Sequence, residues 1–285
     1  MPELPEMENY KNYLQQKVVG KTVTHVAVNR EKSVNLPAAA FIEQVTNQQI
    51  TAVNRRAKYL VFHLQNGSSL LLHLMLGGWM FYGDETDKPD HTVQVQLTFG
   101  DKRLYFFGLR LGYLHLLNAT QLDEEFADLG PEPLTGNLPQ DVFTNQLKSK
   151  RGKLKAALLD QSFIAGIGNR YSDEILWQAQ LKPQRDADEL NIDEALGLYQ
   201  SIKMILQEAI KSGGYMDEPF FSGDGKTGGY KQKMRVHGLQ GKPCQRCGTP
   251  IVEKKLLPVK PVTAPSASID NPKKRLMKST PQIGQ

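Results

Sequence analysis

The sequence predicts a multidomain α+β fold, in which a leading helix and a β-sandwich are followed by a helical domain. Two changes of pattern support this prediction. Short apolar runs, separated by Asn-Gly, Gly-Asp and similar turns, fill residues 21–118. From residue 120 to residue 212 the apolar residues recur instead at helical spacing. The chain of 285 residues is long enough for two such domains.

The first predicted element is a helix over residues 3–18, because apolar residues recur there every three or four positions and Gly20 follows. Strands are expected next, since β-branched and aromatic residues fill short runs between turns, and these strands would form a sandwich or a barrel. The predicted strands are Thr22–Val28, Gln49–Asn54, Tyr59–Leu64, Ser69–Leu74, Thr92–Phe99 and Arg103–Phe107.

Helical spacing then predicts five further helices. They are expected at Leu122–Ala127, Leu138–Leu147, Lys153–Leu159, Ser172–Ala179 and Ile192–Ser212. A glycine-rich loop follows at residues 223–229, and residues 230–236 are expected to form a strand. After Lys254 the composition changes to Pro, Ser, Lys and Thr without periodicity, which predicts a disordered tail.

Charge and composition exclude some classes of protein. No run approaches the roughly 18 apolar residues of a membrane span, and the acidic N-terminus is unlike a signal peptide, so we expect no membrane partner and a cytoplasmic location. The net charge is +5, but six basic residues and Asp270 give residues 255–285 that whole excess, leaving residues 1–254 neutral. Net charge is therefore weak evidence for nucleic acid, and a DNA-binding surface would have to be a local patch.

The second residue, Pro2, carries candidate chemistry. Removal of Met1 would leave a secondary amine at the chain end, and an α-amino group with a pKa of roughly 8 is partly neutral and nucleophilic near neutral pH. Such an amine can attack C1′ of a nucleotide, while Glu3 beside it protonates the opening sugar or the leaving group. The dipeptide alone favours a plainer interpretation, that Pro-Glu is merely a common chain start.

Longer motifs favour the catalytic interpretation of Pro2 over the plainer one. The run Pro2-Glu3-Leu4-Pro5-Glu6 resembles the start of the formamidopyrimidine-DNA glycosylase and endonuclease VIII family, whose members are bifunctional DNA glycosylases and abasic-site lyases. Further segments agree in order and spacing, and the resemblance covers residues 2 to about 254. These segments are residues 55–60 (RRAKYL), residues 160–174 with the helix-two-turn-helix phrase AGIGNRYSDE, and residues 241–248 (GKPCQRCG), which look like the entry to a zinc finger.

The resemblance implies a DNA repair enzyme that excises oxidised or ring-opened bases and cleaves the resulting abasic site. Pro2 would be the Schiff-base nucleophile, Glu3 the proton donor and Glu6 a supporting carboxylate. Lys58 would contact the phosphate beside the lesion and assist β-elimination. The partner would be damaged double-stranded DNA, bound by a monomer associated with the nucleoid.

The resemblance also implies DNA contacts for four further residues. Asn169 enters a helix after two glycines, where backbone N–H groups and the amide can hold a phosphate. His91, Lys150 and Lys155 also match positions at which the family contacts DNA. Ordinary solvated surface is nearly as good an interpretation of these three side chains.

The chain departs from the family where the extruded base is replaced. The formamidopyrimidine branch fills the hole with Met, Arg and Phe; here Leu76, Leu109 and Leu111 stand at those positions. Leucines can wedge between bases, although they are equally well explained as buried core, and Arg110 is one position away from the missing arginine. The selectivity for the opposite base is therefore not carried over. Tyr215 and Met216 replace two threonines of the lesion loop, so the preferred lesion is open as well.

The zinc finger is the largest departure. A structural zinc site needs four ligands, and Cys244 with Cys247 supply two. The family's finger-tip arginine also has no counterpart. Three explanations remain open: a finger that folds without zinc, a site completed by a second chain, or a shift of the reading frame.

The genetic code makes the frame shift a specific hypothesis. Residues 262–270 can be encoded so that the frame two bases on reads Tyr, Cys, Pro, Lys, Cys, Gln, His, stop, which is the missing CxxC with a stop at the family's usual end. Residues 255–261 permit Thr-Ser-Ser-Gly-Lys-Thr-Gly in that frame, a plausible hairpin tip. The nucleotide sequence tests the hypothesis directly.

The predicted organisation and the competing function follow. The domains are a catalytic β-sandwich domain at 1–119, a helix-two-turn-helix DNA-binding domain at 120–236, a partial zinc finger at 237–254 and the tail at 255–285. The alternative function is a non-catalytic or impaired DNA-binding relative that retains the helical motif. Pro2 and Lys58 favour the enzyme over this alternative and over an RNA-binding role of the same helical motif.

Overall fold

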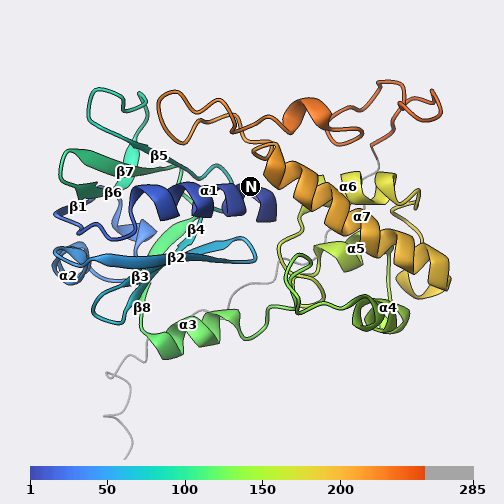
Figure 1. Ribbon diagram of the computed structural model, residues 1–285, viewed down its shortest axis with the longest axis horizontal. Coiled ribbons are helices and arrows are strands. Elements are labelled where there is room, and N and C mark those ends of the chain that lie inside the picture. Colours follow the sequence, from blue (N-terminus) through green and yellow to red (C-terminus); the bar gives the residue numbers. More distant parts are fainter. Residues whose placement is uncertain (254–285) are drawn as a thin grey trace, which may run out of the picture. The chain divides into compact units, whose positions relative to one another are not determined.

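Two antiparallel four-stranded sheets dominate the first half of the computed structural model, which describes residues 1–253 (Figure 1). One sheet has the order β1-β6-β7-β5 and the other β2-β3-β4-β8. The strands are β1 (His25–Val28), β2 (Ile50–Arg56), β3 (Tyr59–Leu64), β4 (Ser69–His73), β5 (Trp79–Gly83), β6 (Val93–Phe99), β7 (Lys102–Phe107) and β8 (Tyr113–Leu117). Their inward side chains form one hydrophobic core, as expected of a β-sandwich.

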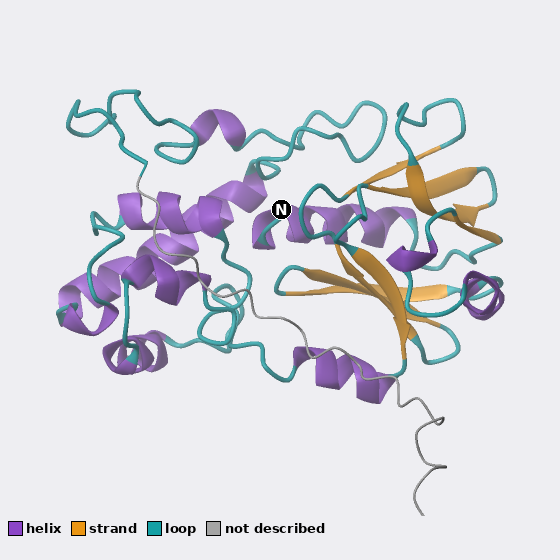
Figure 2. Ribbon diagram, turned by 180° about the vertical axis from the view of Figure 1, so that it is seen from behind, coloured by secondary structure: helices purple, strands orange, loops and turns teal. Residues whose placement is uncertain are grey.

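The leading helix, α1 (Leu4–Lys17), belongs to two cores at once. Met7 and Leu14 pack into the core of the sandwich, whereas Leu4 packs into the core of the helical half. The helix contacts β2 and β3 and also α7, and Figure 2 shows it between the strands and the helices of the second half. An N-terminal segment that would otherwise fray is thereby fixed.

The remaining helices follow, and most of them form the second half. They are α2 (Ala38–Val45), α3 (Ala119–Phe126), α4 (Gln140–Ser149), α5 (Leu154–Leu159), α6 (Asn169–Gln178) and α7 (Ile192–Lys211), with 3-10 turns η1 (Glu31–Ser33), η2 (Ala187–Glu189) and η3 (Lys231–Lys233). The second core is built mainly from α4 to α7, and α6 packs along α7. The predicted α+β class, with a helix-led sandwich before a helical part, is confirmed.

The strand expected at residues 230–236 is wrong. That segment contains only the turn η3, and no neighbouring strand pairs with it in residues 1–253. The backbone N–H groups of residues 235–237 are instead satisfied by the carboxylate of Glu174, at 2.9 to 3.0 Å. The buried side chain of Glu174 therefore supplies the hydrogen-bond acceptors that a partner strand would otherwise provide.

Three elements were missed, namely α2, β5 and β8. All five residues of β5 are buried, and a short continuous apolar run of this kind does not by itself distinguish a strand from a helix. No helix among the described residues combines the length and the apolar character needed to cross a membrane. The predicted tail at 255–285, and the segment on which the frame-shift hypothesis rests, lie outside the described residues.

Candidate active site

The carboxylate of Glu3 is held at the N-terminus of α6. It accepts hydrogen bonds from the backbone N–H groups of Gly168 (2.6 Å), Arg170 (2.9 Å) and Tyr171 (3.3 Å). The first turn of a helix has unpaired N–H groups and a partial positive charge, both of which stabilise a carboxylate. The helical motif therefore fixes the start of the chain.

Two glycines are required by this arrangement. A Cβ at Gly168 would lie 2.4 Å from Cδ of Glu3, and a Cβ at Gly214 would lie 2.4 Å from Oε1 of Glu6. A side chain at either position would therefore displace the carboxylate beside it. The sequence placed the two glycines before Asn169 at the entry to a helix, and the structure adds a reason for Gly168, since the absence of a side chain leaves space for the carboxylate of Glu3.

Glu6 is the second buried carboxylate. Its Oε1 accepts a hydrogen bond from the hydroxyl of Tyr171 at 2.6 Å and from the backbone N–H of Tyr215 at 3.1 Å, while Oε2 accepts one from the backbone N–H of Glu3 at 2.8 Å. Burial raises the pKa of Glu6 to about 7. Tyr171 lies within the predicted motif, but nothing in the sequence indicated that its hydroxyl would reach Glu6.

Lys58 lies at the turn between β2 and β3, with only 7% of the residue exposed. Burial lowers the pKa of its ammonium group, and the negative charges of Glu3 and Glu6 oppose that shift. The lysine predicted from its flanking residues is therefore brought into the electrostatic field of both N-terminal carboxylates, across more than fifty positions of sequence.

Glu132 holds the turn that carries Lys58. Its carboxylate accepts two hydrogen bonds from the guanidinium of Arg55, at 2.9 and 2.7 Å, and a third from the backbone N–H of Ala57 at 2.5 Å. Ala57 has a φ of 51°, a conformation that costs free energy in any residue but glycine and must be maintained by its surroundings. Glu132 was not among the predicted site residues, because a lone acidic residue in the linker carries no local signal of a distant partner.

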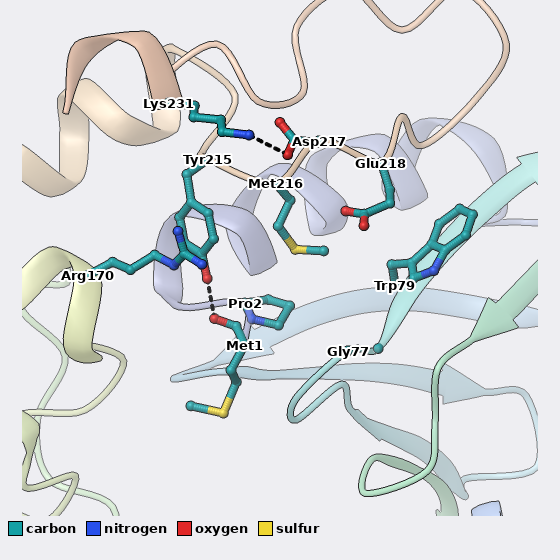
Figure 3. Close-up of a pocket in the computed structure, with 11 residues that line it drawn as sticks. Met1, Pro2, Gly77, Trp79, Arg170, Tyr215, Met216, Asp217, Glu218 and Lys231 are labelled. Carbon is teal, nitrogen blue, oxygen red and sulfur yellow. Dashed lines mark hydrogen bonds and ion pairs between the residues drawn. The ribbon is translucent and has the colours of Figure 1, made fainter. Parts of the chain in front are cut away.

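A pocket of about 240 Å³ opens beside Pro2 (Figure 3). The chain as described retains Met1, so the nitrogen of Pro2 is an amide here. Burial, and then the charge of Arg170, lower the pKa of the Met1 amine. The pocket is lined by Met1, Pro2, Gly77, Gly78, Trp79, Arg170, Tyr215, Met216, Asp217, Glu218 and Lys231.

The three leucines at the positions expected to replace an extruded base, Leu76, Leu109 and Leu111, do not share one environment. Leu76 and Leu111 are 62% and 60% exposed, whereas Leu109 is fully buried in the core of the sandwich. The buried-core interpretation is therefore correct for Leu109 alone, because its side chain turns inward at that loop. Arg110 is exposed beside it.

The loop that carries Leu76 touches the loop that carries Leu109 and Leu111. A Cβ at Gly108 would lie 1.8 Å from the carbonyl oxygen of Gly77, so the loops pack backbone to backbone there. Leu76 and Leu111 consequently project from adjoining loops, next to the glycine that lines the pocket.

Two predicted DNA-contacting lysines are engaged in ion pairs. Nζ of Lys150 lies 2.5 Å from a carboxylate oxygen of Asp160, and Nζ of Lys155 lies 2.6 Å from one of Asp173. The other two predicted contacts are exposed: Asn169 is the first residue of α6, and His91 lies edge-on to Trp79 of the pocket, with 5.5 Å between ring centroids.

Cys244 and Cys247 do not complete a metal site within residues 1–253, where no group of three or more His, Cys, Asp or Glu side chains is placed to hold an ion. The nearby His237 is engaged elsewhere, with Nδ1 2.8 Å from Asp173. The indole N–H of Trp177 donates to Sγ of Cys244, and this contact lowers the pKa of that thiol to about 7. The donor set of the described chain therefore does not fit zinc.

The fold and this cluster define a class of proteins in which a helix-led sandwich and a helix-two-turn-helix domain enclose the N-terminus. Residues 1–113 match the family described as "Formamidopyrimidine-DNA glycosylase N-terminal domain", and residues 129–218 match "Formamidopyrimidine-DNA glycosylase H2TH domain". The chain belongs to the formamidopyrimidine-DNA glycosylase family.

Individual relatives agree with this assignment. The formamidopyrimidine-DNA glycosylases of Pelotomaculum thermopropionicum and Listeria innocua are each 36% identical over 261 residues, covering 90% of this chain and 95% of theirs. Solved structures of the Lactococcus lactis enzyme are also similar. Its complex with DNA containing an abasic site has a TM-score of 0.83 at 29% identity, covering 90% of this chain and 95% of that one. Its complex with DNA containing an oxidised pyrimidine has a TM-score of 0.82.

Proposed function

We propose that this protein excises oxidised or ring-opened bases from double-stranded DNA and cleaves the resulting abasic site through a Schiff base at Pro2. The family supports the glycosylase, and the Lactococcus lactis relative has been solved with an abasic site and with an oxidised pyrimidine. The single observation that carries the proposal is the position of Pro2, which lines the pocket beside two buried carboxylates and a buried lysine.

The surroundings of Pro2 favour a neutral nucleophile. Loss of Met1 converts its amide nitrogen into a secondary amine with a free lone pair. The burial and the positive charge of Arg170 that lower the pKa of the Met1 amine would act on this amine as well. A larger neutral fraction near neutral pH would follow.

The proposed reaction has four steps. The lone pair of Pro2 forms a bond to C1′ while the glycosidic bond breaks, and the base leaves with the electron pair of that bond and gains a proton from water. The proton that the Pro2 nitrogen loses passes to the carboxylate of Glu3, which transfers it to the ring oxygen as the sugar opens to an iminium. Loss of a proton from C2′ to solvent then expels the 3′-phosphate, and water hydrolyses the remaining iminium to an aldehyde and regenerates Pro2. The cation of Lys58 would stabilise the departing phosphate.

The exposed leucines fit the replacement of an extruded base. Leu76 and Leu111 project from adjoining loops near the pocket and could enter the stack, as apolar wedges do in other DNA-binding proteins. Arg110 is the exposed cation next to them and would face the opposite strand. No step is assigned to zinc, because residues 1–253 supply only two of its ligands.

Borohydride trapping tests the proposal. Purified protein would be mixed with duplexes carrying an abasic site, 8-oxoguanine or an oxidised pyrimidine, and the reduced adduct would be mapped by mass spectrometry. We expect an adduct at residue 2, lost or strongly reduced in Pro2→Gly. Protein that retains Met1 is a matched control, since its Pro2 nitrogen is an amide and should give no adduct.

The incomplete cysteine site favours the second candidate, a DNA-binding relative without catalysis. That candidate predicts duplex binding with no adduct from fully processed protein. Absence of the adduct after confirmed removal of Met1 would therefore reject the proposed enzyme. An adduct mapped to a lysine rather than to residue 2 would reject the assigned nucleophile.

A further inference from the structure

The lesion loop, residues 215–229, forms one wall of the pocket beside Pro2. Met216, Asp217 and Glu218 supply this wall, and they lie above Pro2 in the view of Figure 3. Met216 also packs against the core of the sandwich, the core of the helical half and a smaller aromatic cluster of β5 and β7. The shape of the pocket therefore depends on where this loop is held.

Asp224 holds the loop together. Oδ1 of its carboxylate accepts hydrogen bonds from the hydroxyl of Tyr13 at 2.9 Å and from the backbone N–H groups of Lys226 at 3.1 Å and Thr227 at 3.2 Å. Oδ2 accepts one from the backbone N–H of Phe220 at 3.0 Å and one from the hydroxyl of Thr227 at 2.5 Å. Burial alone would raise the pKa of Asp224, but the hydrogen bonds from the loop lower it below its ordinary value. One charged side chain therefore joins both arms of the loop to α1, which carries Tyr13.

Phe220 anchors the same loop to the sandwich. Its side chain is fully buried in the core of the sandwich, where its ring stacks on Tyr13 with 5.3 Å between centroids and 4° between planes. Its carbonyl oxygen accepts a hydrogen bond from the backbone N–H of Tyr82 in β5 at 2.7 Å, and its own N–H is the one that Asp224 accepts. Because this anchor follows closely after Glu218 in the chain, displacing it would displace the pocket wall.

The returning arm of the loop is fixed as well. Nζ of Lys226 donates to Oδ1 of Asn9 in α1 at 3.0 Å, and the backbone N–H of Gly228 donates to the carbonyl of Gly213 at 3.2 Å. A Cβ at Gly213 would lie 1.9 Å from the carbonyl oxygen of Lys226, so the two arms touch where the loop begins and ends. All of these contacts are internal to the protein, so they hold the loop in the free protein.

We propose that Asp224 is a positioning residue for base excision, which fixes the lesion loop so that the free protein already has the wall that contacts an extruded base. The inference rests on the proposed function of Pro2 and deepens it. A loop that became ordered only around the base would spend binding free energy on that ordering, and a fixed loop avoids this cost. An abasic site has no base for the wall to contact. Asp224 should therefore affect removal of a base but not the reaction of Pro2 with an abasic site.

Asp224→Asn tests this distinction. The amide keeps one oxygen, but its NH2 group cannot accept the hydrogen bonds that the second carboxylate oxygen accepts. We expect single-turnover release of the damaged base to slow about 10-fold, because a displacement of ~1 Å in a positioned group can cost that much or more. Borohydride trapping on a duplex with an abasic site should proceed at the wild-type rate. Faster hydrogen exchange at the backbone N–H groups of Phe220 and Thr227 should report release of the loop.

Asp84→Asn is the matched control. Asp84 has a similar arrangement in the loop after β5, where Oδ1 accepts hydrogen bonds from the backbone N–H of Thr86 at 3.1 Å, its hydroxyl at 2.7 Å and the backbone N–H of Asp87 at 3.0 Å. This loop does not line the pocket beside Pro2. We therefore expect Asp84→Asn to leave both base release and abasic trapping unchanged.

Tyr13→Phe is a second test variant, which keeps the ring that stacks on Phe220 but removes the hydroxyl that donates to Asp224. It should slow base release by a smaller factor than Asp224→Asn, again without affecting abasic trapping. The two variants together separate the loss of one contact from a failure of the loop to fold.

The outcomes are distinguishable. Base release at the wild-type rate in both Asp224→Asn and Tyr13→Phe would overturn the inference while leaving Pro2 as nucleophile. Equal slowing of base release and of abasic trapping would also overturn it, because that pattern indicates a general loss of structure. No abasic adduct with fully processed wild-type protein would instead reject the proposed function itself.

Discussion

The carboxylate of Glu3 and the backbone N–H of Gly168 lie 2.6 Å apart, although 165 positions of sequence separate them. The contact joins the N-terminal residue next to the proposed nucleophile with the helical motif characteristic of the family. The two halves of the described chain are thus coupled at the atoms where the chemistry is proposed. A substitution in one half that moves this contact should therefore change the position of groups in the other half.

Gly168→Ala tests this coupling. The added Cβ would meet Cδ of Glu3 at 2.4 Å, so the carboxylate must move away from α6. We expect adduct formation to slow at least 10-fold and the protein to lose about 1–3 kcal/mol of stability. Gly197→Ala in α7 has nothing within 4 Å and should leave activity unchanged while adding roughly 0.5–1 kcal/mol. Equal trapping rates in the two variants would contradict the coupling.

Glu6 should make stability depend on pH. Its pKa is about 7 in the folded protein against an ordinary value of 4.5. Below pH 4.5 the carboxyl group is therefore protonated in both states and does not lower the free energy of unfolding. As the pH rises from 4.5 to 7 the unfolded state ionises first, and the free energy of unfolding should fall by roughly 3 kcal/mol. Glu6→Gln does not titrate and should escape this loss. Urea unfolding at pH 5 and pH 8 measures it, and identical pH dependence of the two proteins would refute it.

Leu76 and Leu109 should behave differently when truncated. Leu109→Ala removes a fully buried side chain and should cost about 2–5 kcal/mol. Leu76→Ala affects a side chain that is 62% exposed, so stability should change by less than about 0.5 kcal/mol. We nevertheless expect base excision by Leu76→Ala to slow, because the wedge is lost. Met204→Ala, on α7 with 53% of the residue exposed, is the control, and normal excision by Leu76→Ala would exclude the wedge.

Glu132→Gln should loosen the turn that carries Lys58. Glu132 and Arg55 are 5% and 6% exposed in their side chains, and breaking such a buried pair costs about 3–5 kcal/mol. Glu85→Gln breaks surface pairs of a side chain that is 57% exposed and should cost less than about 1 kcal/mol. Guanidinium unfolding compares the two, and a small effect at Glu132 would mean that other contacts maintain the turn.

Chelation tests the incomplete metal site. Because two thiolates alone do not make a structural zinc site, EDTA should leave the melting temperature unchanged. Metal analysis of the dialysed protein should find well under one zinc per chain. A chelator-dependent fall in melting temperature would contradict this expectation, and half an equivalent of zinc in a dimer would indicate a site shared by two chains.

Much of the fold was predictable because its signals are local. Short apolar runs between turns predicted most strands and helical spacing predicted most helices, and the resemblance of the flanking phrases singled out Pro2, Glu3, Glu6 and Lys58 as candidates. The strand expected at residues 230–236 failed because Glu174, some sixty positions away, satisfies that backbone. The fully buried β5 was missed because a short continuous apolar run does not by itself distinguish a strand from a helix.

The missed site residues have distant partners. Glu132 is meaningful only beside Arg55 and Ala57, and Tyr171 only beside Glu6. Tyr215 stood out in the sequence as a departure from two threonines, but its contact with the Met1–Pro2 peptide depends on how the loop returns to the N-terminus. Such partners are set by the tertiary fold and leave no periodic pattern.

The binding of Glu3 to α6 has a consequence for the order in which the protein is made. The N-terminus is synthesised first, but the N–H groups that hold its carboxylate belong to residues 168–171, which are added much later. A nascent or truncated chain that ends before these residues has the N-terminal amine but lacks the N–H groups that hold the carboxylate of Glu3. The proposed reactive end is therefore assembled only after the helical motif exists, so no fragment that ends before residues 168–171 joins the proposed nucleophile to that motif.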